Sequence, residues 1–212
     1  MNGFKHLVML LGTISVLLWL GVMTEANAAG AEQPAKLFTL HGPALAQMTQ
    51  QTWNAAWKLP GVVTGPAKAP AIVIFFDPNC PYCAHFWQTM HVMESFMRIR
   101  WVPVALARPS SLGMAVHIVY SRHPRQMLVL NESHFNYKTH RGGVLPAFRV
   151  SPAQAAAIHQ STELLVHNIG ALPATLYPSK TGINVSFGTP NSQQITLIVK
   201  TAIGAWTSGR MP

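Results

Sequence analysis

The chain is poor in cysteine and in acidic residues. Its 212 residues include only 2 Cys and 6 Asp plus Glu, against 15 Lys plus Arg. Two cysteines cannot build a disulfide-dense scaffold, and alone they cannot supply the four thiolates of a structural zinc or iron–sulfur site. Hydrophobic residues make up 49% of the chain, which excludes wholesale disorder, and the length allows one domain with a real core.

The shortage of acids leaves a formal net charge of +9. Basicity of this size raises the question of nucleic-acid binding. The cations between residues 98 and 149 are scattered, however, and form no dense tract. We therefore predict no nucleic-acid partner, and we interpret the cations as the solvated surface of a basic protein that anionic surfaces attract.

Long hydrophobic runs are also scarce, and only residues 7–23 form one. A basic start precedes this run, and Ala26-Asn27-Ala28 follows it. This pattern is typical of a signal peptide, residues 1–28, that is cut after Ala28 during export. The alternative is an uncleaved membrane anchor, because a run of about 17 residues lies at the low edge of a bilayer span.

The apolar pattern of the following residues predicts a mixed α/β order. Residues 43–58 are compatible with a helix, and residues 71–76 read as a buried strand. Residues 83–97 carry apolar side chains at helical spacing, and 99–105 alternate as a second strand. Strand, helix and strand at this spacing make a βαβ unit with parallel strands and a right-handed crossover.

The rest of the chain is predicted to be helical and then to end in a hairpin and a helix. Ser151-Pro152 is typical of a helix start, with Ser as the N-cap. The expected elements are helices at 114–119, from 126 and from 152, a hairpin of 174–177 with 183–187, and a last helix that Asn191 caps.

The two cysteines stand together in Cys80-Pro81-Tyr82-Cys83, between the predicted strand and the amphipathic helix. At the start of a helix, unpaired N–H groups and the helix dipole favour the thiolate of Cys80. Cys83, one turn further on the apolar face, should be buried and less acidic. The pair predicts thiol–disulfide exchange, in which Cys80 attacks a substrate disulfide and Cys83, or a substrate thiol, resolves the mixed disulfide.

Three other uses of this spacing are less favoured. A structural disulfide across so small a loop removes little chain entropy. Zinc needs two more ligands, and the available His85 and His91 lie in the same predicted helix. Covalent haem attachment needs His directly after the second Cys, where Ala84 stands. We therefore expect no metal and no cofactor besides a redox-active Cys80–Cys83 disulfide.

The run from Phe75 to Cys83, followed by Phe86-Trp87, resembles the thioredoxin-like periplasmic disulfide isomerases, and most closely the DsbG branch of the DsbC/DsbG family. The resemblance covers about residue 67 to the C-terminus. It implies a thioredoxin-like α/β fold with a helical insertion at about 106–170. It also implies a periplasmic location, exported protein substrates, and a membrane partner that resets the cysteine pair.

Gly170-Ala171-Leu172-Pro173-Ala174 stands where this family has its cis-proline loop. The resemblance implies a cis bond before Pro173 and a Leu172 backbone that pairs with an extended substrate. The alternative is an ordinary trans proline at the start of an edge strand. Leu172 replaces the Thr or Val expected from the family, so the direction of electron transfer cannot be copied from it.

Two residues near the cysteines have open roles. Asp77 either tunes the site near Cys83 or belongs to an ordinary Asp-Pro turn. Tyr82 is expected to shape the contact surface.

Family members carry a dimerisation domain and a linker helix before the catalytic domain, whereas only residues 29–66 stand there in this chain. We interpret residues 43–58 as the linker helix and expect a monomer or a weak homodimer. The alternative function is a chaperone, or client-binding module, of the envelope, in which redox activity is absent or secondary.

Overall fold

A computed structural model describes residues 46–209 of the chain. The predicted signal peptide, with its cleavage after Ala28, lies outside these residues. Within the described part, no helix is both long and apolar enough to cross a membrane.

The described residues form a six-stranded sheet with the order β1-β6-β5-β3-β4-β2. The central strand β3 is buried along its whole length, as expected for a continuous run of β-branched and aromatic residues. It pairs in parallel with β4 and antiparallel with β5. The strands are β1 (Ala46–Met48), β2 (Val62–Thr64), β3 (Ala71–Phe76), β4 (Arg98–Pro103), β5 (Ala174–Ser179) and β6 (Gly182–Phe187).

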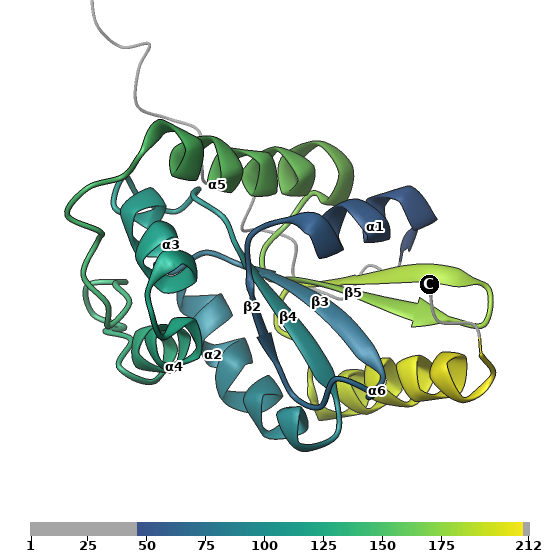
Figure 1. Ribbon diagram of the computed structural model, residues 1–212. Coiled ribbons are helices and arrows are strands. Elements are labelled where there is room, and N and C mark those ends of the chain that lie inside the picture. Colours follow the sequence, from purple (N-terminus) through teal and green to yellow (C-terminus); the bar gives the residue numbers. More distant parts are fainter. Residues whose placement is uncertain (1–45, 210–212) are drawn as a thin grey trace, which may run out of the picture. The chain divides into compact units, whose positions relative to one another are not determined.

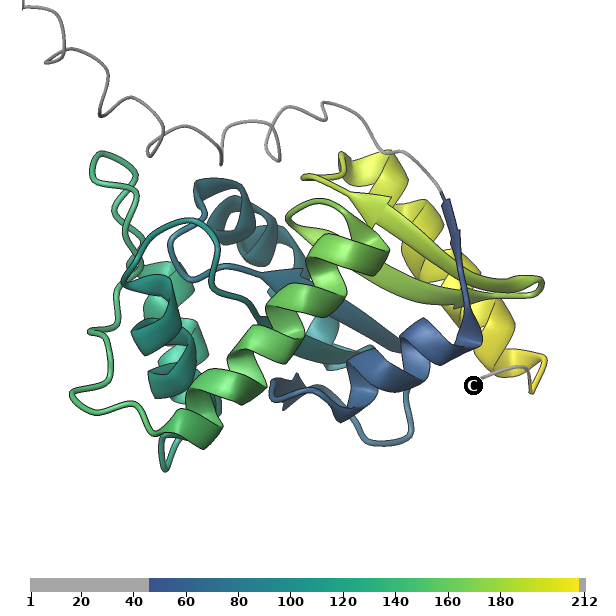
Figure 2. The same ribbon diagram turned by 90° about the horizontal axis from the view of Figure 1, so that it is seen from above.

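Helices cover both faces of this sheet (Figure 1). Helices α1 and α5 run across one face, and α2 and α6 lie on the other (Figures 1 and 2). The helices are α1 (Gln50–Lys58), α2 (Pro81–Met90) with the 3-10 turn η2 (His91–Ser95), α3 (Ser111–Tyr120), α4 (Pro124–Ser133), α5 (Pro152–Leu164) with the π-helical turn η3 (Leu165–Ile169), and α6 (Ser192–Thr207).

This architecture confirms the predicted α/β class with a helical insertion. The unit β3–α2–β4 is the expected βαβ, and α3, α4, α5 and η3 lie between β4 and the hairpin β5–β6. Two predicted caps are also present. The side chains of Ser151 and Asn191 each accept the N–H of the third helical residue. In return, the side chains of Gln154 and Gln194 accept the backbone N–H of Ser151 and Asn191.

The predictions for residues 43–66 were wrong in two respects. The expected helix at 43–58 begins only at Gln50, because Ala46–Met48 form a short edge strand paired with β6. The catalytic domain also begins before residue 67, since β1 and β2 complete the two edges of its sheet. Because Trp53 of α1 is buried in the same core, this helix is part of the domain rather than a linker.

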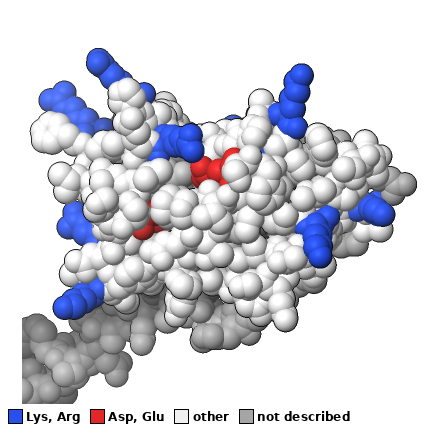
Figure 3. All heavy atoms as spheres, turned by 90° about the horizontal axis from the view of Figure 1, so that it is seen from below, with Lys and Arg blue, Asp and Glu red and all other residues white. Residues whose placement is uncertain are grey.

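The surface charge follows the composition. On the face that Figure 3 shows, Lys and Arg side chains stand apart from one another, and acidic side chains are few. One ion pair joins Arg125 to Glu94 at 3.2 Å.

Candidate redox site

Cys80 is the N-cap residue of α2 and follows directly on the turn after β3. Its Sγ accepts the backbone N–H of Cys83 at 3.4 Å, and its carbonyl accepts the N–H groups of Cys83 and Ala84 at 3.1 Å each. Pro81 occupies the first helical position, where the N–H that proline lacks would have no partner in the helix. The cysteine motif therefore lies between strand β3 and helix α2, as predicted.

Cys83 lies in the first turn of α2 and is buried, as predicted. Burial raises the pKa of the Cys83 thiol well above its usual value, and the neighbouring Cys80 adds to this effect. A hydrogen bond from the backbone of Asp77 acts in the opposite direction. Both cysteines are free thiols, and Cys80 is buried as well, which the sequence did not indicate.

Asp77 is fully buried, and its two carboxylate oxygens accept four hydrogen bonds. Oδ1 accepts the N–H of Asn79 at 2.8 Å and the hydroxyl of Ser111 at 2.7 Å. Oδ2 accepts the N–H groups of Leu106 and Ala107 at 2.7 and 2.8 Å. Burial raises the pKa of Asp77 above its ordinary value, and these hydrogen bonds offset only part of that rise. The residue does more than close a turn, because it ties the segment after β4 and helix α3 to the cysteine loop.

Glu132 of α4 is a second buried carboxyl group, and sequence analysis missed it. Its Oε1 accepts the side-chain amide of Asn131 at 2.9 Å, while its Oε2 is buried with no hydrogen-bond partner. Burial raises the pKa of Glu132 to about 8, with a further contribution from Asp77. The charge of Glu132 in turn helps to raise the pKa of Cys83. Glu132 lies in the helical insertion, so only the tertiary fold brings it to the cysteines.

A pocket of about 630 Å³ opens beside Cys80. Its walls come from the start of α2, the segment after β4 and the turn at 137–140 in the helical insertion. Tyr82 and Tyr137 are 49% and 45% exposed, and the Tyr137 hydroxyl accepts the side-chain amide of Gln88 at 3.3 Å. The lining residues are Asn79, Cys80, Pro81, Tyr82, His85, Ala107, Arg108, Tyr137 and His140.

The peptide bond between Leu172 and Pro173 is cis, so the trans alternative does not hold. The carbonyl of Pro173 accepts the N–H of Gly188 at 2.8 Å. The next residue, Thr189, donates its hydroxyl to the carbonyl of Tyr82 at 3.3 Å. These two bonds tie the proline loop to the cysteine motif through adjacent residues. The side chain of Leu172 is buried.

His85 and His91, the two histidines considered above as zinc ligands, lie in different environments. The ring of His91 stacks on Trp87 with centroids 4.4 Å apart, and its Nδ1 lies 3.0 Å from the Trp87 carbonyl. His85 lines the pocket beside Cys80. In the described part of the chain, no three His, Cys, Asp or Glu side chains are grouped so as to hold a metal ion.

A CxxC motif between a central strand and a helix, with a cis-proline before the neighbouring strand, defines a thioredoxin-like protein. Solved structures agree. The chain is similar to Proteus mirabilis ScsC in a compact conformation, with a TM-score of 0.58 and 19% identity over 76% of this chain and 83% of that one. A periplasmic thioredoxin-like protein from Salmonella enterica serovar Typhimurium gives a TM-score of 0.56 and 18% identity, over 74% and 99% of the two chains.

Curated sequences give the more specific similarity. The thiol:disulfide interchange protein DsbG of Escherichia coli is 30% identical over 170 residues, and that of Pseudomonas aeruginosa is 26% identical over 166. Each match covers 76% of this chain but only 63% and 61% of the relatives, so the chain spans less than two thirds of their length. No family model matches. The predicted resemblance to the DsbG branch is confirmed as a similarity in sequence over 76% of this chain.

Proposed function

We propose that the protein is a thiol–disulfide oxidoreductase of the isomerase or reductase type, acting through Cys80 and Cys83. The observation that carries the proposal is the position of the Cys80 sulfur as cap of α2, where it accepts the N–H of Cys83. A helix start stabilises the anionic sulfur that attacks a disulfide. Similarity to two thiol:disulfide interchange proteins supports the same chemistry.

The reaction begins when the Cys80 thiolate attacks one sulfur of a substrate disulfide. The other substrate sulfur leaves as a thiolate and takes up a proton, and a mixed disulfide with Cys80 remains. Cys83 then loses its proton and attacks Cys80, which forms the Cys80–Cys83 disulfide and leaves the substrate reduced by two electrons. Alternatively, a thiolate from a different cysteine of the substrate attacks the substrate sulfur of the mixed disulfide. Cys80 then leaves as a thiolate, and the substrate holds a rearranged disulfide without net electron transfer.

The burial of Cys83 favours the second branch. Desolvation is the largest cause of the raised Cys83 pKa, and it persists in the mixed disulfide because the side chain remains in the core. A thiol that ionises reluctantly attacks slowly, because the thiolate is the nucleophile. Substrate thiols therefore have time to displace Cys80 first.

The pocket beside Cys80 supports binding of a peptide segment next to the substrate cysteine. Tyr82 and Tyr137 offer exposed aromatic surface, while Arg108 adds positive charge and no acidic residue lines the described pocket. These groups suit a segment that carries acidic or aromatic side chains. In this proposal Leu172 and Pro173 shape the groove, and Asp77 holds the loop that carries Cys80.

The location and partners follow from the N-terminal pattern and the family resemblance. We propose a periplasmic protein that acts on exported proteins and is reset by a membrane thiol–disulfide partner. A monomer or weak homodimer remains the expected state.

The test is reduction of insulin by the full mature chain with dithiothreitol as the electron source. Cys80→Ala should abolish catalysis. In a separate incubation without dithiothreitol, Cys83→Ala should accumulate mixed disulfides with a client whose only two cysteines form one disulfide, because neither Cys83 nor a third client thiol is there to displace Cys80. Ser192→Ala, an exposed change at the start of α6, is the control and should leave activity unchanged. Full activity of Cys80→Ala would refute the assignment.

A client-binding module is the second candidate, and one observation favours it. Leu145 and Phe148, in the segment between α4 and α5, are 71% and 95% exposed. Exposed apolar side chains of this kind are contacts for unfolded clients. The candidate predicts that a Cys80→Ala/Cys83→Ala variant still suppresses client aggregation, and that Leu145→Ser/Phe148→Ser in the parent chain loses this effect. If the double cysteine variant is inert while the parent suppresses aggregation, the candidate fails.

A further inference from the structure

A second pocket, of about 470 Å³, lies at the opposite end of the sheet from the cysteines. Ala71 and Arg98, the first residues of the parallel strands β3 and β4, line it, whereas Cys80 follows the last residue of β3. Its volume falls within the range of small-molecule sites. The cationic and aromatic lining residues are Lys58, Lys68, Arg98, Trp53, Trp57 and Trp206.

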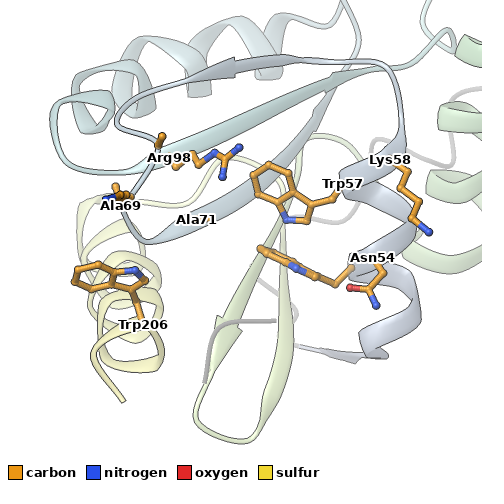
Figure 4. A pocket seen from close by; sticks show the side chains of 10 residues that line it. Asn54, Trp57, Lys58, Ala69, Ala71, Arg98 and Trp206 are labelled. Carbon is orange, nitrogen blue, oxygen red and sulfur yellow. The ribbon is translucent and has the colours of Figure 1, made fainter. Parts of the chain in front are cut away.

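Two arginines share one face of β4 and meet the ring of Trp57. Arg98 and Arg100 are two residues apart, which places their side chains on the same side of the strand. Their guanidinium carbons lie 5.0 and 5.6 Å from the centroid of Trp57. Figure 4 shows Arg98 pointing toward this ring, with Trp206 on α6 across the pocket.

These arginines have little to balance their charge. In the described part of the chain neither forms an ion pair, and no acidic residue lines the pocket. The Nε atoms of both are buried without a hydrogen-bond partner. Arg100 donates one bond to the carbonyl of Leu59, and burial followed by the charge of Arg98 lowers its pKa. Half-buried cations without counter-charge are costly unless an anion joins them.

We propose that this pocket is a binding site for a phosphomonoester that carries a flat or apolar organic group. The guanidinium group of Arg98 presents N–H donors that suit phosphate oxygens, and the ammonium groups of Lys58 and Lys68 add charge at the rim. A dianion matches this concentration of positive charge better than a monoanion does. The apolar part of the ligand lies against the indole rings of Trp57 and Trp206.

The ligand has two sources with the same chemistry. Lys68 is exposed and Trp206 is half-exposed, so the pocket opens to solvent. A soluble phosphomonoester enters such a pocket directly. The phosphomonoester headgroup of an anionic lipid enters it from a membrane surface, with the two residues at the rim facing the lipid.

The experiment titrates phenyl phosphate into the full mature chain and follows heat and tryptophan fluorescence. We expect saturable binding with a Kd of about 1 mM or below, tighter than that of inorganic phosphate. Arg98→Gln and, separately, Lys68→Gln should weaken binding about tenfold or more, and added salt should weaken it in the parent chain. Lys68 lies in an exposed loop, so its substitution tests the site even if Arg98→Gln folds poorly.

Arg122→Gln is the matched control, because it removes the same charge from an exposed position between α3 and α4. It should bind phenyl phosphate as the parent does, and all three variants should retain insulin reduction. Vesicles of phosphatidylcholine with or without phosphatidic acid separate the sources, since selective cosedimentation that Arg98→Gln abolishes indicates the lipid. The proposal is overturned if binding does not saturate up to about 10 mM phenyl phosphate. It also fails if Arg98→Gln and Lys68→Gln both bind like the parent.

Discussion

The two ends of the sheet bury ionisable side chains of opposite kinds, acidic at one end and basic at the other. At the cysteine end, Asp77 and Glu132 are buried carboxyl groups, and neither forms an ion pair with a described residue. At the other end, Arg98 and Arg100 are half-buried guanidinium groups, likewise without a carboxylate among the described residues. Each pair of buried side chains therefore lacks an oppositely charged partner among the described residues.

The difference shows how each kind of charge tolerates burial. Asp77 is compensated by four hydrogen bonds, and Glu132 escapes ionisation because its pKa rises to about 8. Arginine cannot lose its proton at any ordinary pH. Arg98 and Arg100 therefore depend on the ring of Trp57, and Arg100 depends also on the carbonyl of Leu59. In our proposal, Arg98 gains its counter-charge from the anion that the pocket binds. The carboxyl groups at the cysteine end can therefore be buried without a counter-charge, whereas the two arginines stay charged and have no acidic partner among the described residues.

The largest expected effect is the loss of the Asp77 acceptors. In Asp77→Asn one carboxylate oxygen becomes an NH₂ group, which cannot accept from the backbone N–H groups of Leu106 and Ala107. Leaving such buried donors unpaired should lower the free energy of unfolding by about 3 kcal/mol. Urea denaturation measures the change, and insulin reduction should fall with it.

Ser111→Ala is the smaller companion to this change. It removes one donor to Asp77 and leaves both Oδ2 bonds intact, so it should cost only about 1 kcal/mol. If Asp77→Asn proves no more costly than Ser111→Ala, the backbone bonds to Leu106 and Ala107 do not hold this end together.

The second prediction concerns pH. Between the ordinary value of 4.5 and about 8, folded Glu132 keeps a proton that the unfolded chain has released, so its contribution to stability falls as pH rises. Glu132→Gln retains an oxygen for Asn131 and cannot titrate. Relative to the parent, the variant should gain stability between about pH 5 and about pH 8.5, on the order of a few kcal/mol.

Urea denaturation at both pH values measures this gain, and Glu163→Gln on α5 reports the general effect of losing one acidic side chain. A constant difference between parent and Glu132→Gln across this range would mean that Glu132 is ionised throughout. The two ends of the sheet would then carry buried charge in the same way, and the contrast drawn above would disappear.

Local patterns in the sequence were sufficient to predict the framework of the site. The apolar run of β3, the Pro at the start of α2 and the caps Ser151 and Asn191 each determine an element through neighbouring residues. The position of Cys80 follows from the same local rules, because a helix start depends on only a few residues. The cis state of Pro173 came from family resemblance instead.

Features that depend on distant partners could not be predicted in this way. Strand β1 has only three residues and exists through its pairing with β6, which lies more than a hundred residues further along the chain. Glu132 looks like an ordinary helix residue until α4 packs against α2 and buries it. Likewise, Arg98 and Arg100 looked like scattered surface charges, although the fold places both on Trp57.

The smallest expected effect comes from neutralising the arginine end. Arg98→Met keeps the apolar stem that packs against Trp57 but removes a half-buried charge. The lost cation–π contact and the relieved desolvation oppose each other, so the free energy of unfolding should change by less than about 1 kcal/mol in urea denaturation. A loss above about 2 kcal/mol would show that the Arg98 charge is already compensated within the fold, as that of Asp77 is. The Arg98 charge would then stabilise the protein without a bound anion, and its burial would no longer be an argument for an anion-binding site.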